Sequence, residues 1–325
     1  MVKPNICRRL VHLAAGAAAL IGFGILAGGA QSQTARTIKI VVPLAPGGGA
    51  SVLARLLADE ISASQRVTTV VENRPGGGTA IATDAVARAA PDGNTLLLTN
   101  TALLINPHLR KQNYDPLNSF EPICKLVELP AFLAVNSQSP YRTLNDYIAA
   151  ARAKPGQLTL ASFTATGSHI AFEELKRRAN VDIAFVPYPG GAPAVTALLG
   201  GHVTSMIDNF ATMGEHVNAG KLRVLATLSP TRIAEFPQIP TFAEAGYNEY
   251  SGWFSLFAPA KASRETASEL VEWTLAAMQQ PEVRRKLAPL GLYPAAMCGN
   301  DFAALLHKQY EEFGRIIREA NIKTE

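Results

Sequence analysis

The sequence has few cysteines and almost no excess of charge of one sign, and these shortages exclude several kinds of protein. It contains three cysteines, of which only Cys124 and Cys298 lie beyond residue 30. Its histidines, cysteines and carboxylates show no spacing typical of metal ligands, so we expect neither a metal site nor a cofactor. No cluster of basic residues with interleaved aromatic residues is present, which argues against nucleic-acid binding.

The first thirty residues have the pattern of an export signal. Lys3, Arg8 and Arg9 precede an apolar stretch over 10–27, and small residues at 28–30 form a cleavage site. A retained membrane anchor is the less favoured alternative, and no cysteine follows that would carry a lipid. The arginine pair also permits twin-arginine export. We therefore expect cleavage near Ala30 and a periplasmic protein with 27 basic and 26 acidic residues, a net charge of +1.

The two remaining cysteines leave one question open. Export would allow Cys124 and Cys298 to form a disulfide. Their distance in the sequence and their different surroundings, a strand-like and a loop-like segment, favour two free and buried thiols instead.

Strand and helix patterns alternate along most of the chain. Strands are predicted over 38–42, 67–71, 95–99, 158–162, 183–187, 203–207, 222–227 and 252–260. Helices are predicted over 51–64, 79–89, 143–153, 169–179, 192–199, 263–279, 281–290 and 301–319. This order predicts an α/β fold with a mainly parallel sheet and helices on both faces.

About 295 residues remain after the signal, which exceeds one typical hydrophobic core and indicates two lobes. We expect residues 37–135 plus 258–325 to form lobe 1 and residues 136–257 to form lobe 2. No low-complexity linker separates them, so the cleft between the lobes is the expected site.

The stretch PLAPGGGASVLAR, residues 43–55, follows a predicted strand and leads into a predicted helix. A glycine-rich turn of this kind offers backbone N–H groups to an anion. A dinucleotide site is disfavoured because Val52 stands where the third glycine of G-x-G-x-x-G belongs. A hydrolase is disfavoured because no G-x-S-x-G turn surrounds Ser168 and His169.

Several glycine-rich segments together are more specific than any one of them. In order and spacing, PGGGASVLAR, VENRPGGGTA, TATGSHIAFEEL, VPYPGGAPAVTALLGGHV and FPQIPTFAEAG resemble the substrate-binding receptors of tripartite tricarboxylate transporters, the Bug-type family. The resemblance covers the chain from about Ile38 onward. It implies a two-lobe periplasmic-binding-protein fold of type II that closes on a ligand like a flytrap.

The resemblance also implies a function. It predicts a monomeric receptor, not an enzyme, that captures a small organic carboxylate and delivers it to a transporter with one large and one small membrane subunit. A sensor that reports ligand status to a membrane signalling protein is the alternative. The residues expected to bind the ligand are Leu44, Pro46, Gly47, Gly48, Gly49, Ala50, Ser51, Gly77, Gly78, Thr79, Thr164, Ala165, Thr166, Gly167, Ser168, His169, Tyr188 and Asp208.

Three of these residues also have structural interpretations. Ser51 is expected to be the N-cap of its helix. His169 is expected to act more in packing and capping than in ligand contact. Asp208 follows a predicted strand, where it could bind a ligand amine or water or orient its loop.

Overall fold

The computed structural model of the chain describes residues 36–163, 166–188, 190–247 and 250–323. The predicted export signal over residues 1–30 lies outside these ranges, as do Thr164 and Ala165. Within the described ranges, no helix combines the length and the apolar character that a membrane span requires.

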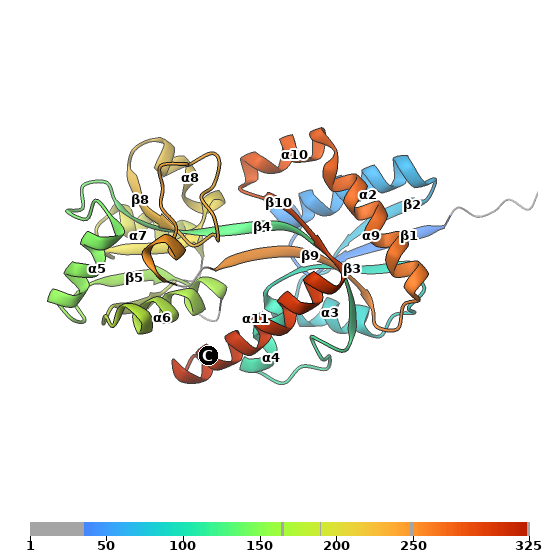
Figure 1. The fold of residues 1–325 in the computed structure, drawn as a ribbon, viewed down its shortest axis with the longest axis horizontal. Helices are drawn as coiled ribbons and strands as arrows, with labels where there is room; N and C mark the ends of the chain where they lie inside the picture. The colour runs from blue at the N-terminus through green and yellow to red at the C-terminus, as the bar shows by residue number, and fades with distance from the viewer. Residues whose placement is uncertain (1–35, 164–165, 189, 248–249, 324–325) are drawn as a thin grey trace, which may run out of the picture. The chain divides into compact units, whose positions relative to one another are not determined.

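The first strands form a parallel sheet with short turns into helices (Figure 1). Strand β1 (Thr37–Val42) lies between β2 (Thr68–Asn73) and β3 (Thr95–Asn100) and pairs in parallel with both. The helices that follow these strands are α2 (Gly49–Gln65), the short η1 (Gly77–Thr79) with α3 (Ala80–Ala87), and α4 (Ala102–Leu109). The predicted strands and helices of this part are confirmed, apart from α4, which has no counterpart in the sequence prediction.

The alternation of side chains along β1 builds two cores. Ile40 packs in one cluster with α2, while its neighbour Val41 packs in another with α3 and α4. Since successive strand residues point to opposite faces, the adjacent apolar residues Ile40 and Val41 require packing partners on both sides of the sheet.

Two long strands continue the sheet and connect its two halves. Strand β4 (Phe120–Asn136) pairs with β9 (Ser251–Pro259) up to Pro130, and with other partners from Ala131 onward. Both strands run antiparallel to their neighbours, so the sheet is mixed, whereas the sequence predicts a mainly parallel one. The sequence also misses β4, because prolines within it weaken the strand pattern.

The second half of the sheet contains β7 (Ser205–Asn209), β5 (Thr159–Ser162) and β6 (Ala184–Pro187), in that order from β4. Strand β8 (Leu222–Thr227) also pairs with β4. One face of this half packs against α5 (Leu144–Ala153) and α6 (Gly167–Ala179), and the other against α7 (Gly191–Leu199) and α8 (Phe210–Asn218).

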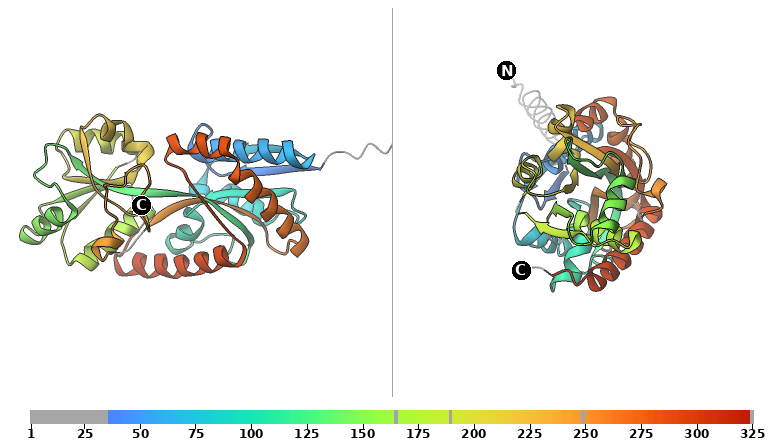
Figure 2. Two further views of the ribbon diagram at one scale, coloured as in Figure 1. Left: turned by 45° about the horizontal axis from the view of Figure 1, so that its top comes forward. Right: turned by 90° about the vertical axis from the view of Figure 1, so that its left-hand side faces the viewer.

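The last segments return to the first half of the sheet. Helices α9 (Arg264–Gln279) and α10 (Pro281–Leu287) cover the same face as α2, and the short η3 (Ala288–Leu290) leads into β10 (Tyr293–Cys298). Helix α11 (Gly299–Glu319) covers the opposite face beside α4 and extends toward α6 (Figure 2). A further short helix, η2 (Ala243–Ala245), precedes β9.

Strand β10 joins the two cysteines. It runs antiparallel to β4 with Cys298 directly opposite Cys124, and the two form a disulfide with their Cα atoms 4.1 Å apart. The expectation of two free thiols is therefore wrong. The cysteines are 174 residues apart, and only the return of β10 to β4 brings them together.

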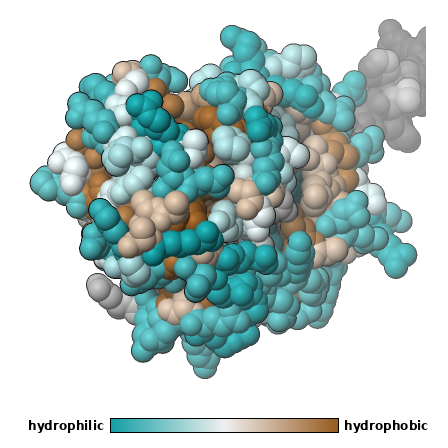
Figure 3. Space-filling model, turned by 60° about the vertical axis from the view of Figure 1, so that its left-hand side comes forward, coloured by the Kyte–Doolittle hydropathy of each residue, from teal (hydrophilic) through white to brown (hydrophobic). Residues whose placement is uncertain are grey.

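Strand pairing divides the described chain into two lobes. We call the lobe with β1, β2, β3, β9, β10 and the start of β4 the first lobe, and the lobe with β5 to β8 and the end of β4 the second lobe. The sequence-based lobe boundaries at 135/136 and 257/258 remain predictions. On the face drawn in Figure 3, hydrophilic residues cover most of the surface, with hydrophobic patches between them.

Candidate functional site

The first glycine turn places a row of backbone N–H groups at the start of α2. Gly48 is the N-cap, and the first helical hydrogen bond runs from the Val52 N–H to the Gly48 carbonyl. The N–H groups of Gly49, Ala50 and Ser51 have no acceptor among the described residues. Unpaired donors at a helix start combine with the helix dipole to favour a negative charge.

Space in front of this row is open. A Cβ atom added to Gly47 or Gly48 would meet no atom within 4 Å. Gly47 has a φ of +92°, a conformation that favours glycine, whereas Gly48 has an ordinary φ of −79°. Pro46 is exposed beside them. The open space therefore lies at Gly47 and Gly48, where no side chain blocks the approach of an oxyanion, whereas a Cβ on Gly49 would contact Leu292 at 3.3 Å.

Ser51 supports the turn from within. It is the third residue of α2, not its N-cap, and its hydroxyl donates to Asn73 Oδ1 at 2.8 Å. The Asn73 amide in turn donates to the carbonyl of Leu44 at 3.0 Å. The N-cap expectation for Ser51 is wrong because the helix begins earlier than predicted, and the Leu44 side chain packs on the core of the first lobe.

The second glycine turn is held by α4. Arg110 donates to the carbonyl of Gly77 at 2.9 Å, and Asn106 donates to that of Gly78 at 2.7 Å. A Cβ on Gly78, at a φ of +61°, would overlap the Arg110 guanidinium. Thr79 is buried with a φ of +83°. The carbonyls of this turn therefore face the protein, which holds the backbone in a left-handed conformation.

The third turn begins α6 in the second lobe. Thr166 is the N-cap, and its hydroxyl accepts from the His169 N–H at 3.4 Å. The His169 ring stacks on Phe185 with their centroids 3.9 Å apart. Burial lowers the pKa of His169 to about 4, with a further contribution from Lys176, so the ring is neutral near pH 7. This geometry agrees with packing as the role of His169, while the cap is made by Thr166.

Asp208 is the last but one residue of β7 and is buried, with 4% of its surface exposed. Its Oδ1 atom accepts from the backbone and side-chain amides of Asn209, at 2.8 and 3.2 Å. Burial raises its pKa to about 6, although Asn209 and Thr212 act in the opposite direction. Tyr188, at the end of β6, is linked to the same edge by its N–H bond to the Ser162 carbonyl.

Two sets of contacts bring the turns of the two lobes together. A Cβ on Gly49 would lie 3.3 Å from Leu292, and one on Gly291 would lie 3.3 Å from Cβ of Phe210, so the starts of α2 and α8 face the same segment. On the other side, the Tyr250 hydroxyl lies 3.3 Å from Thr101 Oγ1 and directly against Gly167. The starts of α2 and α8 therefore meet one segment between the lobes, and the starts of α4 and α6 meet at Tyr250.

Several residues of this region have no place in the sequence prediction. They are Thr101, Asn209, Thr212, Tyr250, Gly291 and Leu292. Thr101 follows a strand and precedes a helix, so the rule that located the glycine turns could also have found it. Tyr250 carries no such signal, because its position depends on the path of the chain from η2 into β9.

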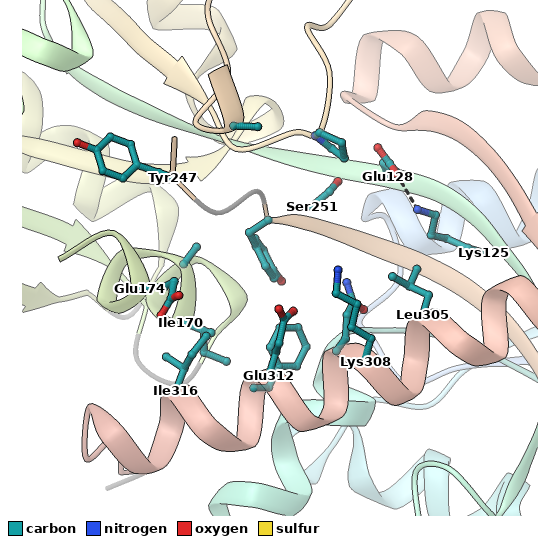
Figure 4. Close-up of a pocket in the computed structure, with 16 residues that line it drawn as sticks. Lys125, Glu128, Ile170, Glu174, Tyr247, Ser251, Leu305, Lys308, Glu312 and Ile316 are labelled. Atoms are coloured by element: carbon teal, nitrogen blue, oxygen red, sulfur yellow. Dashed lines mark hydrogen bonds and ion pairs between the residues drawn. The ribbon is translucent and has the colours of Figure 1, made fainter. Parts of the chain in front are cut away.

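A pocket of about 290 Å³ lies on the α11 side of β4 and β9 (Figure 4). None of the predicted ligand residues lines it. Lys308 and Glu312 project into it from α11, and Lys125 forms an ion pair with Glu128 at 2.6 Å along its edge. Glu174 in its wall is paired with Arg177 and Arg178. Because Lys125, Glu128 and Glu174 are already paired with other side chains, we interpret their charges as stabilising the fold around this pocket.

Metal binding finds no support in the described part of the chain, where no three histidine, cysteine or carboxylate side chains lie together as ligands would.

Comparison with known proteins identifies relatives of this chain. Residues 53–322 match the family described as tripartite tricarboxylate transporter family receptor. Protein BugT of Bordetella pertussis is 34% identical over 304 residues, which are 90% of this chain and 92% of BugT.

Solved structures agree with this result. Rpa4515 of Rhodopseudomonas palustris, solved with adipate, is 28% identical with a TM-score of 0.74, over 90% of this chain and 99% of that one. MatC from the same organism, solved with bound malate, is 28% identical with a TM-score of 0.67, over 87% and 99% of the two chains.

Proposed function

Because the chain belongs to the tripartite tricarboxylate transporter receptor family, whose members are solute-binding receptors, we propose that it captures a small organic carboxylate between its two lobes. It has the two-lobe binding-protein fold of that family. The captured acid is then delivered to a membrane transporter with one large and one small subunit. In this proposal the protein is a periplasmic monomer that catalyses no reaction.

The observation that carries the proposal is the row of unpartnered N–H groups at Gly49, Ala50 and Ser51, with open space in front of Gly48. A hydrogen bond to a charged group contributes about 1.5–3 kcal/mol, and micromolar affinity corresponds to about −8 kcal/mol. Three or four such bonds contribute about 5–12 kcal/mol before ordering costs, so they supply a large part of this affinity without a charged side chain, and contacts with the other lobe supply the rest.

The other lobe completes the proposed site. Its contribution comes from the turn at Thr166 to Ser168, with Thr164 and Ala165, and from the edge formed by Tyr188 and Asp208. The lobes are proposed to meet near 135/136 and 257/258, so that the two long strands act as the hinge. The export signal predicted over residues 1–30 supports the periplasmic location.

The relatives support the ligand class. Rpa4515 was solved with adipate and MatC with malate, and both are small organic acids with two carboxylates. Neither ligand transfers to this chain by similarity alone, since the identities are 28%.

The test is isothermal titration of the mature protein with a panel of dicarboxylates, tricarboxylates, acidic amino acids and aromatic acids, with ATP as a comparison. We expect at least one acid to bind with micromolar or lower Kd and to be recovered unchanged. Binding of ATP in the absence of any acid would contradict the proposal, and so would conversion of the acid.

A further inference from the structure

The end of β7 carries side-chain chemistry that differs from that of the backbone amides. Two side-chain acceptors there are buried and have no hydrogen-bond partner among the described residues, Asp208 Oδ2 and Asn209 Oδ1. Buried polar atoms are almost always bonded, so two orphaned acceptors on neighbouring residues need an explanation.

Among the described residues, no positively charged side chain pairs with Asp208. Its other oxygen accepts from both amides of Asn209, and hydrogen bonding by the Thr212 side chain also acts to lower the pKa of the carboxyl. No arginine, lysine or histidine among the described residues forms an ion pair with it. An unpaired carboxylate oxygen in a buried position is costly unless something donates to it.

Oδ2 is directed toward the start of α7. A Cβ on Gly191 would lie 3.4 Å from this oxygen and would overlap the methyl group of Thr212. The neighbouring N-cap, Gly190, has open space in front of it, because an added Cβ would meet nothing within 4 Å. Thr212 therefore fills the space at Gly191, and the open space at the start of α7 lies at Gly190, next to the glycine that faces the orphaned oxygen.

The chemistry of this oxygen is opposite to that of the amide rows. Amides at helix starts donate, and they suit the oxygens of an acid. A carboxylate and an amide carbonyl only accept, so they repel a second carboxylate and require a hydrogen on the ligand.

We propose that Asp208 accepts a hydrogen bond from a hydroxyl or ammonium group on the bound acid, with Asn209 as a second acceptor beside it. This proposal rests on the proposed function. The ligand class is therefore a hydroxy- or amino-substituted carboxylate, not an unsubstituted diacid. Asp208 determines this specificity, while the amide rows hold the carboxylate oxygens.

The experiment is isothermal titration of the mature protein with matched trios that differ in one substituent. The trios are succinate, malate and aspartate; glutarate, 2-hydroxyglutarate and glutamate; and propionate, lactate and alanine. We expect a substituted member to bind at least about 10-fold more tightly than its unsubstituted partner, since a site built to bond a polar group rejects the analogue that lacks it. The hydroxy and amino arms identify which donor is accepted.

Two variants separate recognition from structural support. Asp208→Asn retains the shape but presents an amide, and it should reduce the ratio between substituted and unsubstituted acids to about 3-fold or less. Glu215→Gln removes the same charge from the exposed side of α8 and should leave the ratio unchanged. Thermal melts check that both variants fold.

The outcomes are distinct. Unsubstituted acids that bind wild type as tightly as their substituted partners overturn this inference and leave the proposed function standing. An equal loss of affinity for all acids in Asp208→Asn, with the ratio preserved, also overturns it, because this is the result of a structural role alone. Failure of every acid to bind overturns the proposed function and this inference together.

Discussion

The hydroxyl of Tyr250 occupies the space in front of Gly167, so that a methyl group at this glycine would overlap the tyrosine ring. Tyr250 also contacts Thr101 of the first lobe through its hydroxyl, at 3.3 Å. Burial raises the pKa of Tyr250 to about 12, and the phenol therefore stays protonated and available as a donor. One tyrosine thus fixes the start of α6 against the end of β3.

Gly167→Ala should destabilise the protein only while Tyr250 is present. The added methyl must displace the ring, which we expect to cost about 1–3 kcal/mol of unfolding free energy. In a Tyr250→Ala background the same change should not lower the unfolding free energy, since alanine is a better helix former than glycine. Urea unfolding of the four proteins in this cycle measures the coupling, and additive effects would contradict the contact.

Gly48→Val should abolish ligand binding without harming the fold. Gly48 has an ordinary φ of −79° and no neighbour within 4 Å of an added Cβ, so valine fits the protein but fills the space before the amides. We expect binding of the best acid in the panel to weaken by at least about 100-fold, which corresponds to about 2.7 kcal/mol.

Two matched variants serve as controls for Gly48→Val. Arg74→Ala removes an exposed cation near the second glycine turn and should change the Kd by less than about 3-fold. Ala153→Val adds comparable bulk at an exposed position at the end of α5. A large loss in Arg74→Ala with binding retained in Gly48→Val would mean that side-chain charge governs the site.

The disulfide should contribute substantially to stability. It closes a loop with a sequence separation of 174 residues, and cross-links of long loops contribute about 2–5 kcal/mol. Reductant should therefore lower the urea midpoint of wild type to that of the Cys124→Ala/Cys298→Ala variant. The midpoint of the variant itself should not respond to reductant, and a wild-type midpoint insensitive to full reduction would contradict this account.

His169 should make the protein less stable as the pH falls from 6.5 toward 4. Burial lowers the pKa of the folded-state ring to about 4, so in this window the unfolded chain binds a proton that the folded chain does not. The unfolding free energy lost through His169 over this pH window amounts to about 3 kcal/mol at most. Asp208, with its pKa raised to about 6, acts in the opposite direction over part of the range, because its burial favours the protonated form.

The comparison with His169→Gln isolates this contribution. Unfolding free energies of wild type and variant, measured between pH 4 and 7.5, should converge as the pH falls. A constant difference across the range would show that the histidine does not titrate differently in the two states.

The glycine turns could be predicted because their chemistry is local. The turn at Gly47 to Gly49 follows an apolar strand and precedes an amphipathic helix, and this order alone exposes the first N–H groups of α2. Element bounds were off by a few residues, which is why Ser51 proved to be the third residue of α2, with its hydroxyl bonded to Asn73.

Other features depend on which distant segments meet. The prolines within β4 hide the strand from the local pattern, and its change of partner from β9 to β7 and β8 at Ala131 depends on distant segments. The pairing of Cys124 with Cys298 follows from the return of β10, and the contact of Tyr250 with Gly167 from the path into β9.

The sequence by itself determined the alternation of strands and helices and the amide-bearing turns, because apolar periodicity and the lack of a Cβ in glycine act within a few residues. Only the tertiary structure decided the disulfide, the tyrosine between the lobes and the orphaned oxygen of Asp208. Burial and the absence of a partner are properties of everything packed around a group, and the neighbours of a residue in sequence do not specify them.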